Sequence, residues 1–215
     1  MCCVSLFVAC GTEQDWIDTG VSSPYHDCSI LEYLRSDTMN WQLTVVLIEE
    51  AGLTQLFEGK DPNYKEITFF APPSFSILRY VWDEKKEAGE QLTPKELADA
   101  RVLIRALGQD WCREIVMRHL VKGKYLKESC SFRNKEFSAA ASEQDGCTDI
   151  ICEGGNKLRV YRQTTDYGGV PDAGPVEMYI YSFDAMMNVP LASPDIQPLN
   201  GVVHALNYNY VLGNI

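Results

Sequence analysis

The sequence predicts an α+β fold in which most helices come first and most strands follow. Between residues 30 and 122, apolar residues recur mainly at helical spacing, interrupted by one strand-like run, Ile67–Ala71. From Tyr125 onward the pattern changes to the alternation typical of strands, with Gly- and Pro-rich turns between them. Helices and strands segregated along the chain in this way are typical of α+β folds, and no internal repeat marks a second domain.

The first helices are predicted from their start and stop signals. Ile30–Arg35 can form a short helix. Asn40 is a good N-cap for a longer helix, and Gly52 fits the end of that helix. A short helical piece follows and is expected to end at Gly59.

The expected strand Ile67–Ala71 runs into Pro72 and Pro73, which stop it. Ser74 can cap the helix that follows. The run Asp83–Glu90 is highly charged and contains a glycine, so we expect a solvated loop there.

Two more helices are predicted before the strand-rich half. Thr93–Glu96 combines a capping box with a proline at the first helical position. Asp110 is expected to cap the last helix, with His119 as a cation near its negative end and Gly123 after it.

The second half carries the strand signals. Residues 157–160 and 177–183 alternate, and Gly201–Leu212 is expected to be the last long strand. The Asn200–Gly201 pair before it predicts a hairpin with a type I′ turn, whose two central residues need positive φ. Residues 131–149 are polar and rich in Ala and Ser, which predicts an irregular excursion.

Composition and charge exclude some classes of partner. The chain has 215 residues, is 46% hydrophobic and carries a formal net charge of −11. An acidic surface repels phosphate, so neither nucleic acid nor simple docking on anionic lipid is expected. No apolar run reaches the roughly 18 residues of a membrane-spanning helix.

The N-terminus predicts an exported, lipid-anchored protein. Cys2–Cys10 is uncharged and apolar, and polar residues follow it directly. Phe7–Cys10 resembles a bacterial lipoprotein cleavage box, which would make Cys10 the lipidated residue. We therefore expect a signal remnant at 1–10, a tether at 11–27 and a single domain at 28–215. A buried apolar first strand is the alternative.

The remaining cysteines give no disulfide pattern. After the three in the expected signal, an odd number remain, so at least one is unpaired or paired outside the chain. These are Cys28, Cys112, Cys130, Cys147 and Cys152. The last three cluster in one loop-rich stretch where a local bridge could form; buried thiols are the alternative for each.

Three segments resemble motifs of the fasciclin-like domain family, and they occur in that family's order. The first is a hydrophobic strand running into Ala-Pro and a helix, at residues 67–75. The second is a helix end of the form His-x-Val-x-Gly-x-Tyr/Leu, represented here by 117–126. The third is an Asn-Gly turn leading into Val-Val-His-x-Leu, within 195–208. The motif residues are Ala71, Pro72, Ser74, His119, Gly123, Asn200, Gly201 and His204.

This resemblance implies a β-sandwich or wedge with several helices packed against one side and edge. It also implies adhesion or extracellular binding, and a single such domain behind a lipoprotein signal resembles Bacteroidota-type outer-membrane lipoproteins. Insertions are expected near 83–110 and 131–149. Some animal members carry a Tyr-His pair linked to integrin adhesion, but Arg118 stands before His119 here, so integrin binding is not carried over.

The side chains that could carry chemistry are dispersed. Three histidines without metal spacing and the lack of nucleotide-binding or nucleophile-elbow motifs predict no metal, no cofactor and no enzyme. His204, between two apolar residues of a strand, is expected to be a buried structural residue. Of the tyrosines, Tyr167 and Tyr210 are the best candidates for a ligand site, and packing across strands is the alternative.

These observations predict a non-catalytic binding or adhesion module that contacts a protein or a matrix glycan. It would be lipid-anchored in the outer membrane, facing the cell surface or the periplasm. An accessory subunit of an outer-membrane glycan-uptake system is the second hypothesis.

Overall fold

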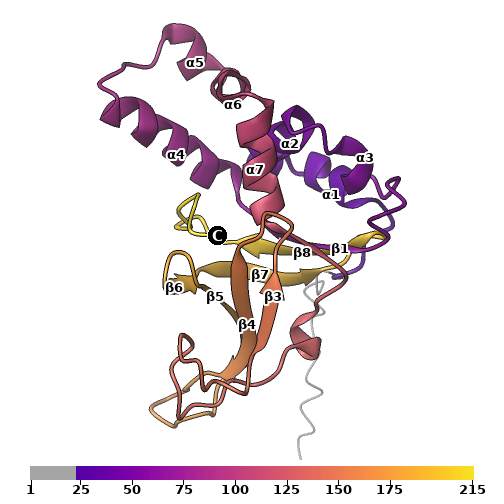
Figure 1. The fold of residues 1–215 in the computed structure, drawn as a ribbon, viewed down its shortest axis with the longest axis vertical. Helices are drawn as coiled ribbons and strands as arrows, with labels where there is room; N and C mark the ends of the chain where they lie inside the picture. The colour runs from indigo at the N-terminus through magenta and orange to yellow at the C-terminus, as the bar shows by residue number, and fades with distance from the viewer. Residues whose placement is uncertain (1–22) are drawn as a thin grey trace, which may run out of the picture.

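The computed structural model describes residues 23–215 and confirms the α+β class (Figure 1). The helices are α1 (Ile30–Ser36), α2 (Thr38–Glu50), α3 (Thr54–Phe57), α4 (Ser74–Glu87), α5 (Pro94–Ala98), α6 (Arg101–Leu107), α7 (Gln109–Arg118) and the 3₁₀ turn η1 (Lys127–Ser129). The strands are β1 (Ile67–Ala71), β2 (Leu120–Lys122), β3 (Thr148–Ile151), β4 (Lys157–Thr164), β5 (Val176–Ser182), β6 (Met187–Val189), β7 (Leu191–Ile196) and β8 (Gly201–Leu206).

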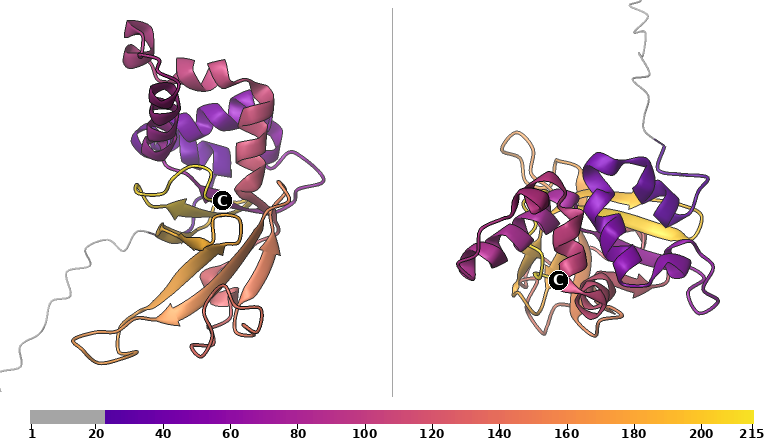
Figure 2. Two further views of the ribbon diagram at one scale, coloured as in Figure 1. Left: turned by 60° about the vertical axis from the view of Figure 1, so that its left-hand side comes forward. Right: turned by 90° about the horizontal axis from the view of Figure 1, so that it is seen from above.

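The strands form two four-stranded sheets. The first has the order β2-β1-β8-β7, with β1 parallel to β8 and the other pairs antiparallel. The second is antiparallel throughout, in the order β3-β4-β5-β6. The chain passes from the second sheet to the first at Pro190, between β6 and β7. The helices cover one side of the first sheet, and the second sheet extends away on the other side (Figures 1 and 2).

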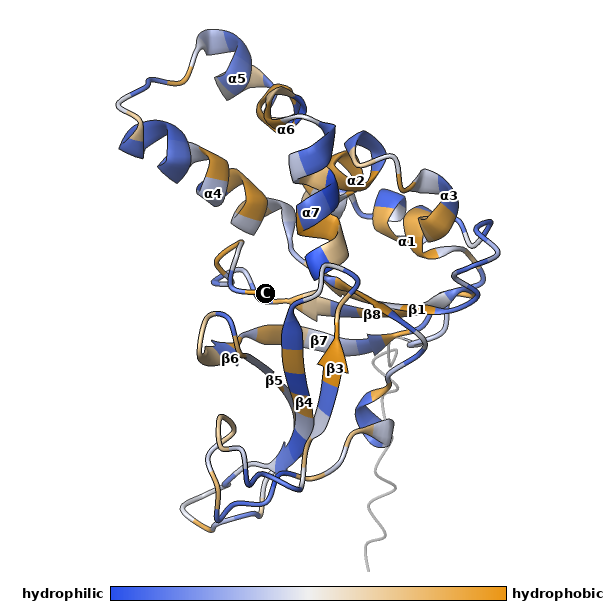
Figure 3. Cartoon of the chain, in the orientation of Figure 1, coloured by the Kyte–Doolittle hydropathy of each residue, from blue (hydrophilic) through white to orange (hydrophobic). Residues whose placement is uncertain are grey.

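The core lies where the helices meet the first sheet. Every residue of β1 and β8 is buried, and so are seven residues of α2. Apolar positions accordingly cluster on α1, α2 and the base of α4, whereas the far end of α4 and α5 are hydrophilic (Figure 3). Parallel pairing of β1 with β8 places the first and third motif segments side by side, with Phe69 opposite Val203.

Two helix signals act differently from the prediction. Asp37, rather than Asn40, caps α2, because the Asp37 carboxylate accepts the Asn40 backbone N–H at 3.1 Å. Ser74 does not cap α4; it is the first residue of that helix, and its hydroxyl accepts the Leu43 N–H at 3.0 Å. Gly52 has a φ of 70° just after α2, as a C-terminal glycine should.

Most of the charged run Asp83–Glu90 was assigned wrongly to a loop, and only residues 88–90 lie outside the helix. Helix α4 continues through it to Glu87, because Lys and Glu are good helix formers and their charges face solvent. The capping box at Thr93–Glu96 is confirmed. Asp110 lies inside the first turn of α7, and Gly108 holds the cap position. The last strand, β8, ends at Leu206 rather than Leu212.

Within residues 23–215 the structure contains no helix with the length and hydropathy that crossing a bilayer requires. The division of the chain at residues 10 and 27 stays a prediction, and Cys10 lies outside the described residues.

Candidate functional site

The Asn200–Gly201 pair lies against the start of α1 and the end of α3. Asn200 Oδ1 accepts the Ile30 N–H at 2.8 Å, and Asn200 Nδ2 donates to the Phe57 carbonyl at 3.1 Å. A Cβ atom on Gly201 would lie 2.0 Å from the Ile67 carbonyl oxygen, so only glycine fits there. The hairpin β7–β8 exists, but the type I′ turn is wrong, since Asn200 is not among the described non-glycine residues with positive φ.

His119 is fully buried just after α7. Its Nδ1 lies 2.7 Å from the Ile115 carbonyl oxygen, and its Nε2 lies 2.8 Å from the Tyr210 hydroxyl. Because a carbonyl only accepts, Nδ1 carries the proton and Nε2 accepts from Tyr210. Burial lowers the pKa of His119 to about 4, so the expected helix-end cation is wrong. Tyr210 has no exposed surface and offers no face to a ligand.

His204 is a second buried imidazole, on β8. Its Nε2 lies 2.8 Å from the Tyr125 carbonyl oxygen and donates to it, and its Nδ1 accepts the Asp195 N–H at 3.2 Å. Burial lowers its pKa, against smaller raising effects of the Tyr125 carbonyl and the Asp195 carboxylate. The ring also stacks on Phe70, with centroids 5.4 Å apart. The structure therefore places His204 as a packing and hydrogen-bonding residue.

The other motif residues join the same elements. Ala71 ends β1 in the core, and the Pro72 carbonyl accepts the buried Thr44 hydroxyl. Gly123 follows β2 with a φ of 97°, and its carbonyl accepts the Thr68 hydroxyl at 2.8 Å. These residues hold the helices to the first sheet and do not form an exposed site.

The five cysteines of the described region are all free: Cys28, Cys112, Cys130, Cys147 and Cys152. The local bridge considered for the last three is therefore not present. Burial raises the pKa of all five thiols, which makes them poor nucleophiles.

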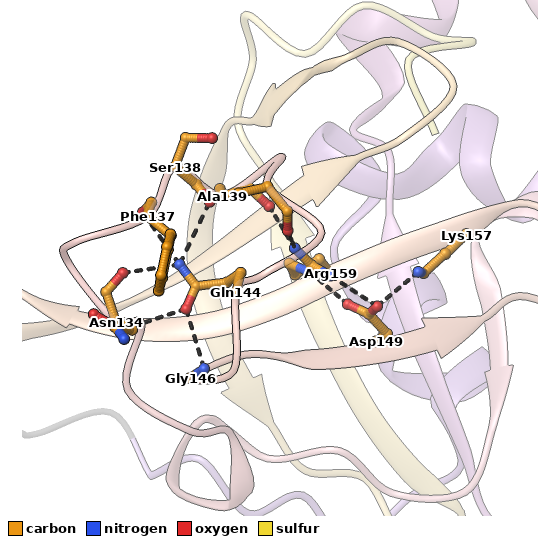
Figure 4. Close-up of polar contacts among 10 residues, drawn as sticks. Asn134, Phe137, Ser138, Ala139, Gln144, Gly146, Asp149, Lys157 and Arg159 are labelled. Carbon is orange, nitrogen blue, oxygen red and sulfur yellow. Dashed lines mark hydrogen bonds and ion pairs between the residues drawn. The ribbon is translucent and has the colours of Figure 1, made fainter.

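The excursion at 131–149 is mostly a loop that the hydrogen bonds of Gln144 hold in place (Figure 4). Gln144 Nε2 donates to the carbonyls of Asn134 and Phe137, at 2.8 and 3.2 Å. Gln144 Oε1 accepts the N–H groups of Asn134 and Gly146, at 2.9 and 3.1 Å. A single buried amide thus holds backbone groups from Asn134 to Gly146 together.

Arg159 of β4 anchors the same loop to the second sheet (Figure 4). Its guanidinium pairs with Asp149 through two contacts of 2.5 and 3.0 Å, and donates to the carbonyls of Ala139 and Ala141. Arg159 is 5% exposed, and Lys157 also contacts Asp149, at 2.7 Å. These cations hold the pKa of Asp149 at about 2.

Aromatic side chains line the face of the second sheet under this loop. Tyr161 stacks on Tyr179 at 5.4 Å, and Tyr181 meets the Phe183 edge at 5.4 Å. Together with Ala139 they form a small apolar cluster of their own. The tyrosines at 161, 179 and 181 therefore pack across strands, as the alternative interpretation held.

The far end of the second sheet presents exposed apolar residues on ordered loops. Tyr167 is 73% exposed and Val170 57% exposed, and their backbones pair within the β4–β5 connection. Phe132 is 47% exposed and bridges to β4. An ion pair between Lys135 and Asp172 joins the two loops, which lie together at the lower end of Figure 1. We call Phe132, Tyr167 and Val170 the loop-end surface.

The loop-end surface presents exposed apolar side chains that can contact a partner. Exposed aromatics on a rigid support are typical anchors of binding interfaces. No group of three metal-ligating side chains occurs within residues 23–215. Of the loop-end surface, sequence reasoning found only Tyr167; Gln144 and Arg159 were missed, because nothing local marks a polar residue that satisfies distant carbonyls.

No family model matches the chain, and no curated protein matches it. Among solved structures, it is similar to a FAS1 domain pair from the insect cell adhesion molecule fasciclin I. The identity is 14% and the TM-score 0.45, over 80% of this chain and 44% of that one. Membership of the fasciclin-like family therefore stays a prediction, and this chain spans less than half the length of that domain pair.

Proposed function

We propose that this chain is a non-catalytic extracytoplasmic binding module, anchored as a lipoprotein through Cys10, that contacts a partner through its loop-end surface. The observation that carries the proposal is the double anchoring of the 131–149 loop by Gln144 and Arg159. Ordering a loop before binding removes an entropic cost that a flexible loop would incur on association. Phe132 lies on this loop, and Tyr167 lies on the β4–β5 connection, which the Lys135–Asp172 ion pair joins to it.

The partner in this proposal is a protein or matrix glycan at the cell surface or within the envelope. The binding test uses the purified chain on a sensor surface, exposed to solubilised envelope and matrix preparations. The affinity of the captured partner is then measured with Phe132→Ser and Tyr167→Ser combined. We expect a loss of about tenfold or more, since aromatic anchors dominate interface energies.

Leu199→Ser is a matched control for this test, because Leu199 is equally exposed, at 72%, but lies in the β7–β8 connection. It should leave the affinity within about twofold. Equal losses in both variants, or in neither, would remove the loop-end surface from the proposal.

Anchoring and orientation have separate tests. Cys10→Ala should release the protein from the membrane fraction, and continued membrane association would contradict the anchor. Protease shaving of intact cells, followed with an antibody, should digest the domain if it faces outward. Protection until the outer membrane is permeabilised would place it in the periplasm and leave envelope scaffolding as the function. Turnover in a broad hydrolase panel would contradict a non-catalytic role.

A further inference from the structure

Two adjoining hollows flank the helix-facing side of strand β7, away from the loop-end surface. One, of about 310 Å³, lies between the start of α2 and the ends of β7 and β8. The other, of about 330 Å³, lies between residues 23–26 and β7. Tyr33, Ser193 and Ile196 line both. Each hollow has the size of a small ligand site, and because they share three lining residues we treat the pair as one site, the β7 groove.

Aromatic rings occur along the β7 groove. Tyr208 is 56% exposed at the first hollow, where Trp41 lies at depth, only 5% exposed. Half-buried Tyr33 forms the wall between the hollows, and the His26 ring packs on it at a centroid distance of 4.7 Å. Aromatic faces are electron-rich and attract the polarised C–H groups on one side of a saturated, hydroxylated ring.

Polar groups beside these rings are already held in position. The Asp37 carboxylate accepts the Asn40 side-chain N–H at 2.6 Å and the Asn40 backbone N–H at 3.1 Å. The Tyr208 hydroxyl in turn donates to Asn40 Oδ1. The carboxylate retains free lone pairs, Asn40 retains an amide N–H, and Ser193 adds a hydroxyl. Donors and acceptors that stand close together in this way can hydrogen-bond adjacent hydroxyl groups.

The charge of the β7 groove decides the class of ligand. Asp37 and Asp195 line it, and no Lys or Arg occurs among the described residues of its lining. Sulfated, phosphorylated or uronic ligands would therefore be repelled. A basic peptide is the competing class of ligand, and the aromatic rings and uncharged donors beside the carboxylates favour a neutral hydroxylated ligand over it; both carboxylates also already accept N–H groups. Asp195 Oδ1 accepts the Lys127 N–H at 2.8 Å, and Asp37 accepts twice from Asn40.

We infer that the β7 groove binds a neutral oligosaccharide, with one sugar ring in each hollow. The first ring packs on Tyr208 and bonds Asp37 and Asn40 through adjacent hydroxyls. The second packs against Tyr33 and bonds Ser193. This site is separate from the loop-end surface and does not depend on it; it would suit the accessory role in glycan uptake.

The test uses the full chain on an array of neutral di- to hexasaccharides beside sulfated, uronic and basic-peptide probes. Titration calorimetry then follows the best neutral ligand. Tyr208→Ala should weaken binding by about tenfold, whereas Tyr208→Phe, which keeps the stacking face, should lose about twofold to fivefold. Ser193→Trp fills the groove from its shared wall and should abolish binding without removing Tyr208.

Trp82→Ala is the matched control, because it removes an exposed aromatic ring of α4 that does not line the β7 groove. It should leave saccharide affinity unchanged. The inference is overturned if no neutral saccharide shows binding at ligand concentrations up to about 10 mM, because a dissociation constant above that value is too weak to be useful. Binding only of sulfated, uronic or peptide probes, or neutral binding that survives both Tyr208→Ala and Ser193→Trp, overturns it equally. These outcomes do not affect the result of the partner-binding test with the Phe132 and Tyr167 variants, so the two proposals can fail separately.

Discussion

The Asn200 side chain and the Ile30 backbone N–H, 170 residues apart in sequence, form a buried hydrogen bond of 2.8 Å. The same amide reaches the Phe57 carbonyl, so one side chain satisfies the start of α1 and the end of α3. Both backbone groups would otherwise be buried without a partner in this region of the core. The β7–β8 connection therefore fastens the N-terminal helices to the first sheet.

Asn200→Ala should destabilise the fold by about 2–4 kcal/mol, because two buried backbone groups lose their partners. Urea unfolding followed by circular dichroism measures this. Asn200→Asp is the informative companion: it keeps the acceptor for Ile30 but turns a carboxylate toward the Phe57 carbonyl. A variant as stable as the parent in either case would show that water replaces the amide.

Asn200 also shows where local sequence signals end. The Asn-Gly pair correctly predicted a hairpin. It is usually a hairpin signal because both residues adopt positive φ in a type I′ turn, but that is not how this pair is used. Asn200 is used for its amide, and Gly201 for the close approach of β8 to Ile67. Ser74 is a similar case, since its hydroxyl serves Leu43 on a neighbouring helix rather than its own helix. A cap or turn residue in the sequence indicates that its side chain hydrogen-bonds a backbone group, but the tertiary structure determines which backbone group that is.

Because His119 is buried, we expect the fold to lose stability in mild acid. Its pKa is about 4 in the folded protein, against 6.5 for the free side chain, so the unfolded state binds more protons between these values. Stability is therefore fully present above pH 6.5 and falls as the pH drops toward 4. The fall attributable to His119 approaches about 3 kcal/mol, at about 1.4 kcal/mol per pKa unit.

The measurement is the free energy of unfolding at several pH values between 4 and 7 for the parent and for His119→Gln. Glutamine can donate to Ile115 and accept from Tyr210 without titrating, so its curve should be flatter in this window. His204, whose pKa is also lowered by burial, titrates in both proteins and cancels in the difference. Parallel curves would mean that His119 is already charged in the folded state.

Val203→Asp should unfold the domain. Val203 has no exposed surface and lies opposite Phe69 at the centre of the first sheet. A carboxylate there has no partner, and the expected cost exceeds about 4 kcal/mol, a large part of the stability of an ordinary domain. Leu199→Asp, at a position that is 72% exposed, should leave the melting transition in place. A normal melting curve for Val203→Asp would mean that β8 is assigned wrongly.

The sequence predicts that residues 131–149 leave the regular strands, but it does not predict that this loop is ordered. Ala- and Ser-rich, polar sequence gives no periodicity, and its order comes from Arg159, twenty residues after Ala139, and from an internal amide. Tyr210 failed as a ligand candidate for a related reason, because its partner His119 lies 91 residues away. Exposure is a tertiary property, and the sequence identified Tyr167 only through its position near a turn.

Gln144→Ala should loosen this loop while leaving the core intact. It removes the donor to Asn134 and Phe137 and the acceptor for two N–H groups, all within the loop. Amide hydrogen exchange across 134–146 should accelerate by about tenfold or more, corresponding to the loss of about 1–3 kcal/mol of local stability. The melting temperature should change little, since the core cluster under the helices does not include these residues.

Gln144→Glu keeps the acceptor but cannot donate, so amide exchange in the loop should also be fast in this variant. Protection that persists in both variants would show that Arg159 alone orders the loop, and the affinity of the loop-end surface should then be unaffected by either change.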